Sequence, residues 1–242
     1  MNLLDDFTSQ YKPGAATAIE NNLVLNWYPD RILQRLGDVK DATLLELGLG
    51  HGYSTCLFHP RFREHTVIDG SAEVIGLFTA RHQLPGLMIV QGFFETFETE
   101  ERYDVILMGF VLEHVDDPGL IVARYRRLLR PGGRLFVAVP NAKSKNRRMG
   151  LELGKIPDIY ELNANDKLLG HQRQFCLTTL KQLMHSQGYD VPWVEGIYLK
   201  PLPLATLQTL PDFEQNLVAM CRVGVDFPDL CVALLIEAVP QI

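Results

Sequence analysis

The sequence lacks the cysteine patterns that hold zinc or build a disulfide framework. Only four of its 242 residues are cysteines, and no two of them form a Cys-x-x-Cys pair or another zinc-like spacing. We therefore expect reduced thiols in a cytoplasmic protein. The four cysteines are Cys56, Cys176, Cys221 and Cys231.

Long apolar runs are also absent. No stretch approaches the roughly 20 apolar residues of a membrane span. The first residues, Met1 to Asp6, lack the basic region and the apolar run of a secretion signal. We expect no membrane partner and a cytoplasmic location.

An excess of basic residues is the third missing feature. Lys and Arg number 23 and Asp and Glu number 29, which gives a formal net charge of -6. Proteins dedicated to DNA or RNA normally present a large basic surface. The composition therefore predicts that nucleic acid is not a partner.

What the sequence does contain is an apolar strand that runs into three alternating glycines. Residues 43–47 form the strand, Gly48, Gly50 and Gly52 follow it, and Ser54 begins a helix. A ligand can lie against the backbone at glycine, and a helix N-terminus offers unpaired N–H groups. Such a strand, turn and helix usually bind a nucleotide. The GxGxG spacing differs from the GxGxxG of dinucleotide enzymes, which disfavours a nicotinamide-dependent oxidoreductase.

Strands alternate with helices along most of the chain, which predicts right-handed crossovers and a doubly wound parallel sheet in one α/β domain. We expect residues 1–36 to form an N-terminal cap, in which Pro29 divides the helical segment into two. Residues 141–171 are expected to be a lid-like insertion and residues 203–226 a helical insertion. The expected strands are 43–47, 66–69, 87–90, 103–109, 134–140, 191–199 and 230–239, and the expected helices include 72–81, 120–129 and 177–187.

The pattern Glu46-x-Gly48-x-Gly50-x-Gly52 resembles the first motif of class I S-adenosylmethionine-dependent methyltransferases of the small-molecule type. Asp69, the segment 111–118 and the Leu-Arg-Pro-Gly-Gly of residues 129–133 follow in the order and spacing of that family. The resemblance covers roughly residues 40 to 140. It implies a Rossmann-like methyltransferase fold of seven strands, mostly parallel with an antiparallel last strand.

The resemblance also implies S-adenosyl-L-methionine as cofactor and S-adenosyl-L-homocysteine as product. The three glycines would pass beneath the methionine moiety, Glu46 would meet its ammonium group directly or through water, and Asp69 would hold the ribose. Phe93 and Phe94 would flank the adenine. The expected cofactor-binding residues are Glu46, Gly48, Gly50, Gly52, Asp69, Gly70, Phe93, Phe94, Met108 and Gly109.

Glu113 and His114 raise the question of a metal. Similar Leu-Glu-His-Val segments contribute to a metal site in some ubiquinone-pathway O-methyltransferases, which carry another acid three residues before the glutamate. Phe110 stands at that position here and cannot ligate. Two ligands make a poor site for a hard cation, so the sequence predicts no metal.

Methyl transfer is an in-line displacement in which the protein mainly aligns the nucleophile and excludes water. An oxygen nucleophile of high pKa needs a base, and His171 is the candidate because it follows the lid-like segment. The alternative is a histidine that holds the lid. Arg173 is either a clamp for a substrate anion or a surface charge. Expected substrate contacts are Tyr11, Asn22, Tyr28, His114 and Arg173.

The resulting hypothesis is a monomeric or weakly dimeric methyltransferase of a small polar metabolite. O- or N-methylation of a sugar or a natural-product intermediate is the preferred reaction. A methyltransferase acting on protein or nucleic acid and a non-catalytic S-adenosylmethionine-binding module are the alternatives.

Overall fold

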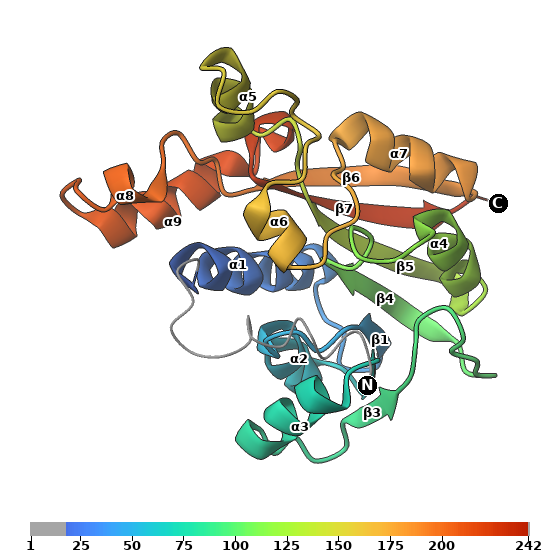
Figure 1. Ribbon diagram of the computed structural model, residues 1–242. Coiled ribbons are helices and arrows are strands. Elements are labelled where there is room, and N and C mark those ends of the chain that lie inside the picture. The colour runs from blue at the N-terminus through green and yellow to red at the C-terminus, as the bar shows by residue number, and fades with distance from the viewer. Residues whose placement is uncertain (1–17, 242) are drawn as a thin grey trace.

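The computed structural model describes residues 18–241 and builds them around one seven-stranded sheet (Figure 1). The strand order is β3-β2-β1-β4-β5-β7-β6. β7 runs antiparallel to both of its neighbours, and the other pairs are parallel. The prediction of a doubly wound sheet with an antiparallel last strand is confirmed. The strands are β1 (Thr43–Leu47), β2 (Glu64–Asp69), β3 (Met88–Gln91), β4 (Tyr103–Gly109), β5 (Leu129–Pro140), β6 (Tyr189–Ile197) and β7 (Ala233–Pro240).

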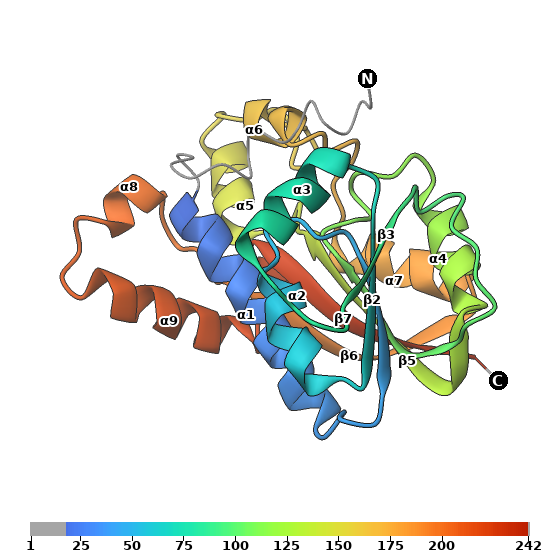
Figure 2. The same cartoon turned by 90° about the horizontal axis from the view of Figure 1, so that it is seen from below.

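Helices cover both faces of this sheet (Figures 1 and 2). α1, α2 and α9 pack on one face, and α4 and α7 pack on the other. Short 3-10 turns lie at His59–Arg61 and Pro228–Leu230. The helices are α1 (Ala18–Leu36), α2 (Tyr53–Phe58), α3 (Ala72–Arg81), α4 (Pro118–Arg126), α5 (Lys145–Glu152), α6 (Ala164–Leu168), α7 (Leu177–Ser186), α8 (Leu204–Leu207) and α9 (Phe213–Gly224).

The central strands are apolar on both faces, as expected when helices cover a parallel sheet on both sides. In β1, Leu44 packs with α1 and α2, whereas Leu45 packs with α4 and α7. Val105 and Ile106 divide between the same two faces in β4. This arrangement leaves only the ends of these strands to reach a ligand.

Most predicted boundaries lie within three residues of the observed ones, and two predictions were wrong for reasons that packing explains. α1 is one continuous helix with Pro29 inside it, because Tyr28 and Ile32 are both buried against the sheet and hold the two halves in line. β5 begins at Leu129, where the sequence predicted the last turn of a helix. Leu129 pairs with Tyr103 of β4, and this pairing ends the helical stretch at Arg126.

The outer segments add helices around the sheet. The segment 141–171 contains α5 and α6, and the segment 203–226 contains α8 and α9. α8 and the N-terminal end of α9 extend away from the sheet in both views (Figures 1 and 2), whereas Leu217 and Cys221 of α9 pack on it. Among the helices of residues 18–241, none has the length and apolar character needed to span a bilayer.

Candidate functional site

A cavity of about 1380 Å³ lies where the chain leaves the carboxyl ends of β1, β2, β3 and β4. Ligands in open α/β sheets bind in this crevice. One part of the lining comes from the glycine turn and the loops after β2 and β3. The other part comes from α1, the turn after β4 and the segment around α6.

The glycine turn forms the floor of the first part. Gly48, Gly50 and Gly52 all have positive φ, at 83°, 49° and 80°, a region that other residues rarely adopt. A Cβ on Gly52 would lie 2.6 Å from ring carbons of Phe78. The turn therefore requires glycine for both its backbone conformation and its packing against α3.

Asp69, at the end of β2, holds this turn in place. Its carboxylate accepts hydrogen bonds from the backbone N–H groups of Leu49 at 2.9 Å and Ser71 at 2.8 Å. The side chain is largely buried and lies in the cavity lining. One carboxylate thus joins the loops after β1 and β2 at the place where a polar ligand would meet both.

Glu46, near the end of β1, is buried, unlike a typical carboxylate at the surface of a protein. It accepts hydrogen bonds from the hydroxyls of Ser54 and Thr55 and lies 3.0 Å from Nε2 of His65. Its relative exposure is 1%, and it still contributes to the cavity lining. A carboxylate has about four acceptor positions, so Glu46 retains capacity for a further donor.

Most of the other expected cofactor residues share the cavity. Phe93 is half exposed, and Phe94 is partly buried. Met108 differs, because its side chain is fully buried in the core and it is not among the lining residues. The expected cofactor residues that line the cavity are Glu46, Gly48, Gly50, Gly52, Asp69, Gly70, Phe93, Phe94 and Gly109.

Tyr28 lies on the second part of the lining. It is buried and packs edge-on against Phe110, with ring centroids 5.6 Å apart. Burial, followed by the charge of Glu46, raises the pKa of its phenol. Asn22 is exposed and accepts a hydrogen bond from the Tyr53 hydroxyl, outside the lining. Tyr11 lies outside the described residues.

His171 is oriented by a carboxylate that the sequence reasoning did not single out. Its Nδ1 lies 3.3 Å from Oδ1 of Asp166. Asp166 in turn receives the Asn163 N–H, in a reciprocal capping box at the start of α6, and lies 3.5 Å from Arg147. The spacing of Asn163 and Asp166 is the available sequence signal for this arrangement.

Arg173 braces the turn after β4. Its guanidinium donates to the backbone carbonyls of Leu112, Val115 and Asp116, and it is not among the cavity-lining residues. Arg173 therefore stabilises the turn after β4, and it is neither a clamp for a substrate anion nor a free surface charge in this structure.

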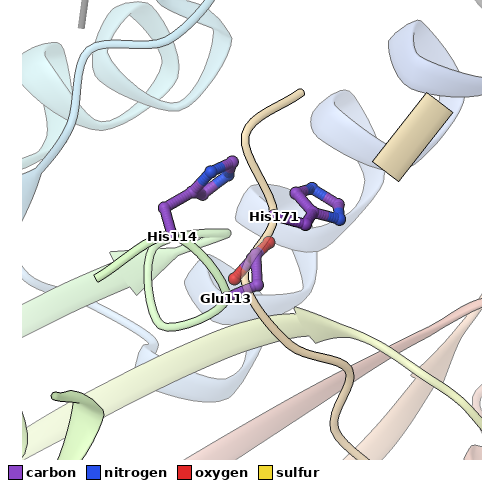
Figure 3. A group of neighbouring side chains, drawn as sticks. All are labelled: Glu113, His114 and His171. Atoms are coloured by element: carbon purple, nitrogen blue, oxygen red, sulfur yellow. The ribbon is translucent and has the colours of Figure 1, made fainter. Parts of the chain in front are cut away.

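Glu113 and His114 stand opposite His171 (Figure 3). The rings of His114 and His171 meet edge to face, with centroids 4.8 Å apart. Burial raises the pKa of Glu113 to about 7, and the nearby charges of His171 and Arg173 oppose that rise. Burial, with the charge of His171, lowers the pKa of His114 to about 4.

A long-range ion pair also lines the cavity. Lys200 pairs with Glu20 at 2.6 Å, although 180 positions separate them. No local pattern in the sequence could have brought these two residues to one cavity.

Comparison with known proteins assigns the chain to a family. Residues 25–192 match the family model described as a methyltransferase domain. Trans-aconitate 2-methyltransferase of Azoarcus sp. (strain BH72) is 32% identical over 177 residues, which cover 66% of this chain and 69% of that relative. Ubiquinone biosynthesis O-methyltransferase of Serratia proteamaculans (strain 568) is 33% identical over 130 residues, or 52% of each chain, so the match spans about half of that relative.

The fold is also found among solved structures. Burkholderia thailandensis 1,6-didemethyltoxoflavin-N1-methyltransferase, solved with bound 1,6-didemethyltoxoflavin and S-adenosylhomocysteine, superposes with a TM-score of 0.64 at 19% sequence identity. The superposition covers 99% of this chain and 88% of that one.

Proposed function

This chain belongs to the methyltransferase domain family, and from that premise we propose that it transfers a methyl group from S-adenosylmethionine to an oxygen atom of a small polar molecule. S-adenosylmethionine dependence follows from the family. The acceptor is the proposed part. One observation carries it: the glycine turn with Asp69 and the pair His114 and His171 line the same cavity.

The residues around the glycine turn suit S-adenosylmethionine. Asp69 offers carboxylate oxygens to ribose hydroxyls, and the enclosed Glu46 offers one to an ammonium group. The backbone of Gly48 to Gly52 permits close approach of the ligand. Phe93 adds an aromatic face next to the loop after β3, where an adenine ring would stack. We propose these roles for the lining residues given above.

Bound S-adenosylmethionine supplies an activated methyl group, and the residues of this chain arrange the acceptor. The buried Tyr28 and the partly buried Phe110 present aromatic surface to the cavity, which helps to exclude water. His171, held by Asp166, is the proposed proton acceptor for an acceptor hydroxyl. Fixing the acceptor oxygen in line is the main contribution that a protein makes to such a displacement.

Several features favour a small acceptor. Arg147 and Lys200, basic residues of the lining, are both paired with carboxylates of the lining, which does not suit a polyanionic nucleic acid. The relatives named above carry names of small-molecule methyltransferases. Sugars and natural-product intermediates with free hydroxyls are the first acceptors to test. We also propose that the protein is cytoplasmic and is a monomer or a weak homodimer.

The experiment separates the cofactor from the acceptor. Calorimetry with S-adenosylmethionine on the wild type and on Asp69→Ala measures cofactor binding, and Asp190→Ala is the matched control on exposed β6 surface. Methyl-labelled cofactor is then incubated with a metabolite extract, total RNA or cell protein. We expect label in small molecules. Label confined to RNA or protein would reject the proposed acceptor, and release of no S-adenosylhomocysteine with any mixture would favour a non-catalytic module.

A further inference from the structure

The segment after α6 brings a third potential metal ligand, His171, next to Glu113 and His114 of the turn after β4. One candidate ligand atom from each of Glu113, His114 and His171 lies within 4.8 Å of the other two. In the view of Figure 3 the carboxylate of Glu113 lies just below the two imidazole rings. From the sequence only two ligands, Glu113 and His114, were predictable, because His171 is remote from them in the chain.

Glu113 needs a partner that the described residues do not provide. Its side chain is fully buried, and neither carboxylate oxygen has a hydrogen-bond partner among residues 18–241. An unpaired buried carboxylate is costly, and buried charges are normally paired or coordinate metals. The cavity-facing position of Glu113 leaves room for a cation at this point.

The surrounding contacts fix the two elements that carry the ligands. The backbone N–H of Gln172 donates to the carbonyl of Glu113 at 2.8 Å, and its side chain reaches the carbonyl of His114 at 2.7 Å. Oδ1 of Asp166 lies 3.3 Å from Nδ1 of His171, within ion-pair distance. A carboxylate on one ring nitrogen of a histidine is the usual outer partner of a metal ligand, and it leaves the other nitrogen available.

We propose that Glu113, His114 and His171 bind one divalent transition-metal ion at the acceptor end of the cavity. Two imidazoles and one carboxylate suit Zn²⁺, Fe²⁺, Co²⁺ or Ni²⁺, whereas Mg²⁺ and Ca²⁺ prefer oxygen ligands. Bonds of about 2.0–2.2 Å require the side chains to close slightly on the ion. Three protein ligands leave open positions toward the cavity, where an oxygen-bearing acceptor would coordinate.

This inference goes beyond the proposed function and changes the role of one residue in it. With an ion bound, the free nitrogen of His171 is a ligand and no longer accepts a proton. The ion would then lower the pKa of the acceptor hydroxyl. Metal binding itself does not depend on the identity of the acceptor, so it is tested separately from methyl transfer.

The test uses tag-free, chelator-treated protein titrated with Co²⁺, followed by calorimetry and by the visible absorption bands of the ion. We expect one equivalent to bind and Mg²⁺ not to displace it. His171→Gln and Glu113→Gln should weaken Co²⁺ binding by about 100-fold or more, and Asp166→Asn by roughly 10- to 100-fold. His185→Gln, on the exposed surface of α7, should leave it unchanged.

Thermal melting shows whether each variant is folded. Because His171 is less buried than Glu113, His171→Gln tests the site even if Glu113→Gln does not fold. Absence of saturable Co²⁺ binding by the wild type would overturn the proposal. Binding that survives in both His171→Gln and Glu113→Gln would overturn it as well, and displacement by Mg²⁺ would reject the transition-metal assignment. S-adenosylmethionine binding, measured on the same samples, reports on the proposed function independently.

Discussion

Oδ1 of Asp166 lies 3.3 Å from Nδ1 of His171. The contact joins the first turn of α6 to the segment that follows this helix. Asp166 is itself fixed by Asn163 and Arg147, so the imidazole is held from behind while its ring meets that of His114 in front. These contacts give His171 a defined orientation in the cavity.

His171→Gln should lower kcat/KM for methyl transfer in the metal-free protein by about 10²- to 10⁴-fold, the usual contribution of a positioned base. Asp166→Asn should cost less, roughly 10- to 100-fold, because it only loosens the ring. Both variants should bind S-adenosylmethionine normally in calorimetry. His185→Gln serves as the control, and equal rates for the wild type and His171→Gln would reject the base.

Asp69→Asn should weaken S-adenosylmethionine binding by roughly 10- to 100-fold, because hydrogen bonds to a charged group contribute about 1.5–3 kcal/mol. The variant also loses part of its hold on the Leu49 N–H, so the glycine turn should become less ordered. Calorimetry measures the affinity, and Asp190→Asn is the matched control. Unchanged affinity would show that Asp69 has only a structural role.

Gly52→Ala should destabilise the fold more than Gly37→Ala. Both glycines have positive φ, at 80° and 76°, and an alanine there costs about 1–2 kcal/mol. Only at Gly52 would the new Cβ meet Phe78, at 2.6 Å, whereas Gly37 has nothing within 4 Å. We expect a further ~1–3 kcal/mol from that overpacking.

Urea unfolding of the two variants measures the difference. The double variant Gly52→Ala with Phe78→Leu should recover part of the loss, because a smaller side chain relieves the contact but leaves the backbone strain. Equal free energies of unfolding for the two single variants would show that α3 moves aside at no cost.

The part of the site that the sequence could predict is the part built from strand ends. β1 and β2 are parallel neighbours, so the glycine turn and Asp69 must meet at one edge, whatever the helices do. The alternation of strands and helices along the chain likewise predicted the doubly wound sheet. The carboxyl ends of parallel strands are thus the positions at which local sequence translates directly into a site.

The sequence did not show which of two neighbouring residues in a helix or strand faces the cavity. Asn22 is exposed while Asn21 lines the cavity, because neighbouring positions of a helix point about 100° apart. The side chain of Met108 points into the core, whereas Gly109 reaches the cavity because it is the last residue of β4. At α1 the correct helix was predicted with the neighbouring residue, whereas at β4 the prediction included both Met108 and Gly109, of which Gly109 lines the cavity.

The sequence also did not show which residues far apart in the chain come into contact. The backbone N–H of Gln172 donates to the carbonyl of Glu113 and so joins the segments that carry His171 and Glu113. Which residues of the two segments meet depends on where α6 ends. The sequence around Glu113 and the sequence around His171 do not show that these two residues lie close together. The cluster that bears most on the acceptor was therefore visible only in the folded chain.

Cys176 gives a prediction about pH. Burial alone would raise the pKa of its thiol, but hydrogen bonds outweigh burial and lower the pKa to about 7. They come from the Tyr160 hydroxyl at 3.3 Å and from Thr179. In the unfolded chain the thiol keeps its ordinary pKa, close to 9.0. The unfolded state therefore binds more protons between pH 7 and 9, and stability should rise with pH across this window.

The contribution of Cys176 is present above pH 9 and is lost as the pH falls through about 7, the pKa of the folded state. Cys176→Ser should remove this slope from the free energy of unfolding measured by urea at stepped pH. Tyr160→Phe should reduce it, because one donor to the thiolate is gone, and thiolate absorbance should then appear at higher pH. Cys56→Ser is the control, since burial raises the pKa of that thiol. Parallel stability curves for the wild type and Cys176→Ser would show that the thiol is protonated across the window, and that Tyr160 and Thr179 do not hold a thiolate.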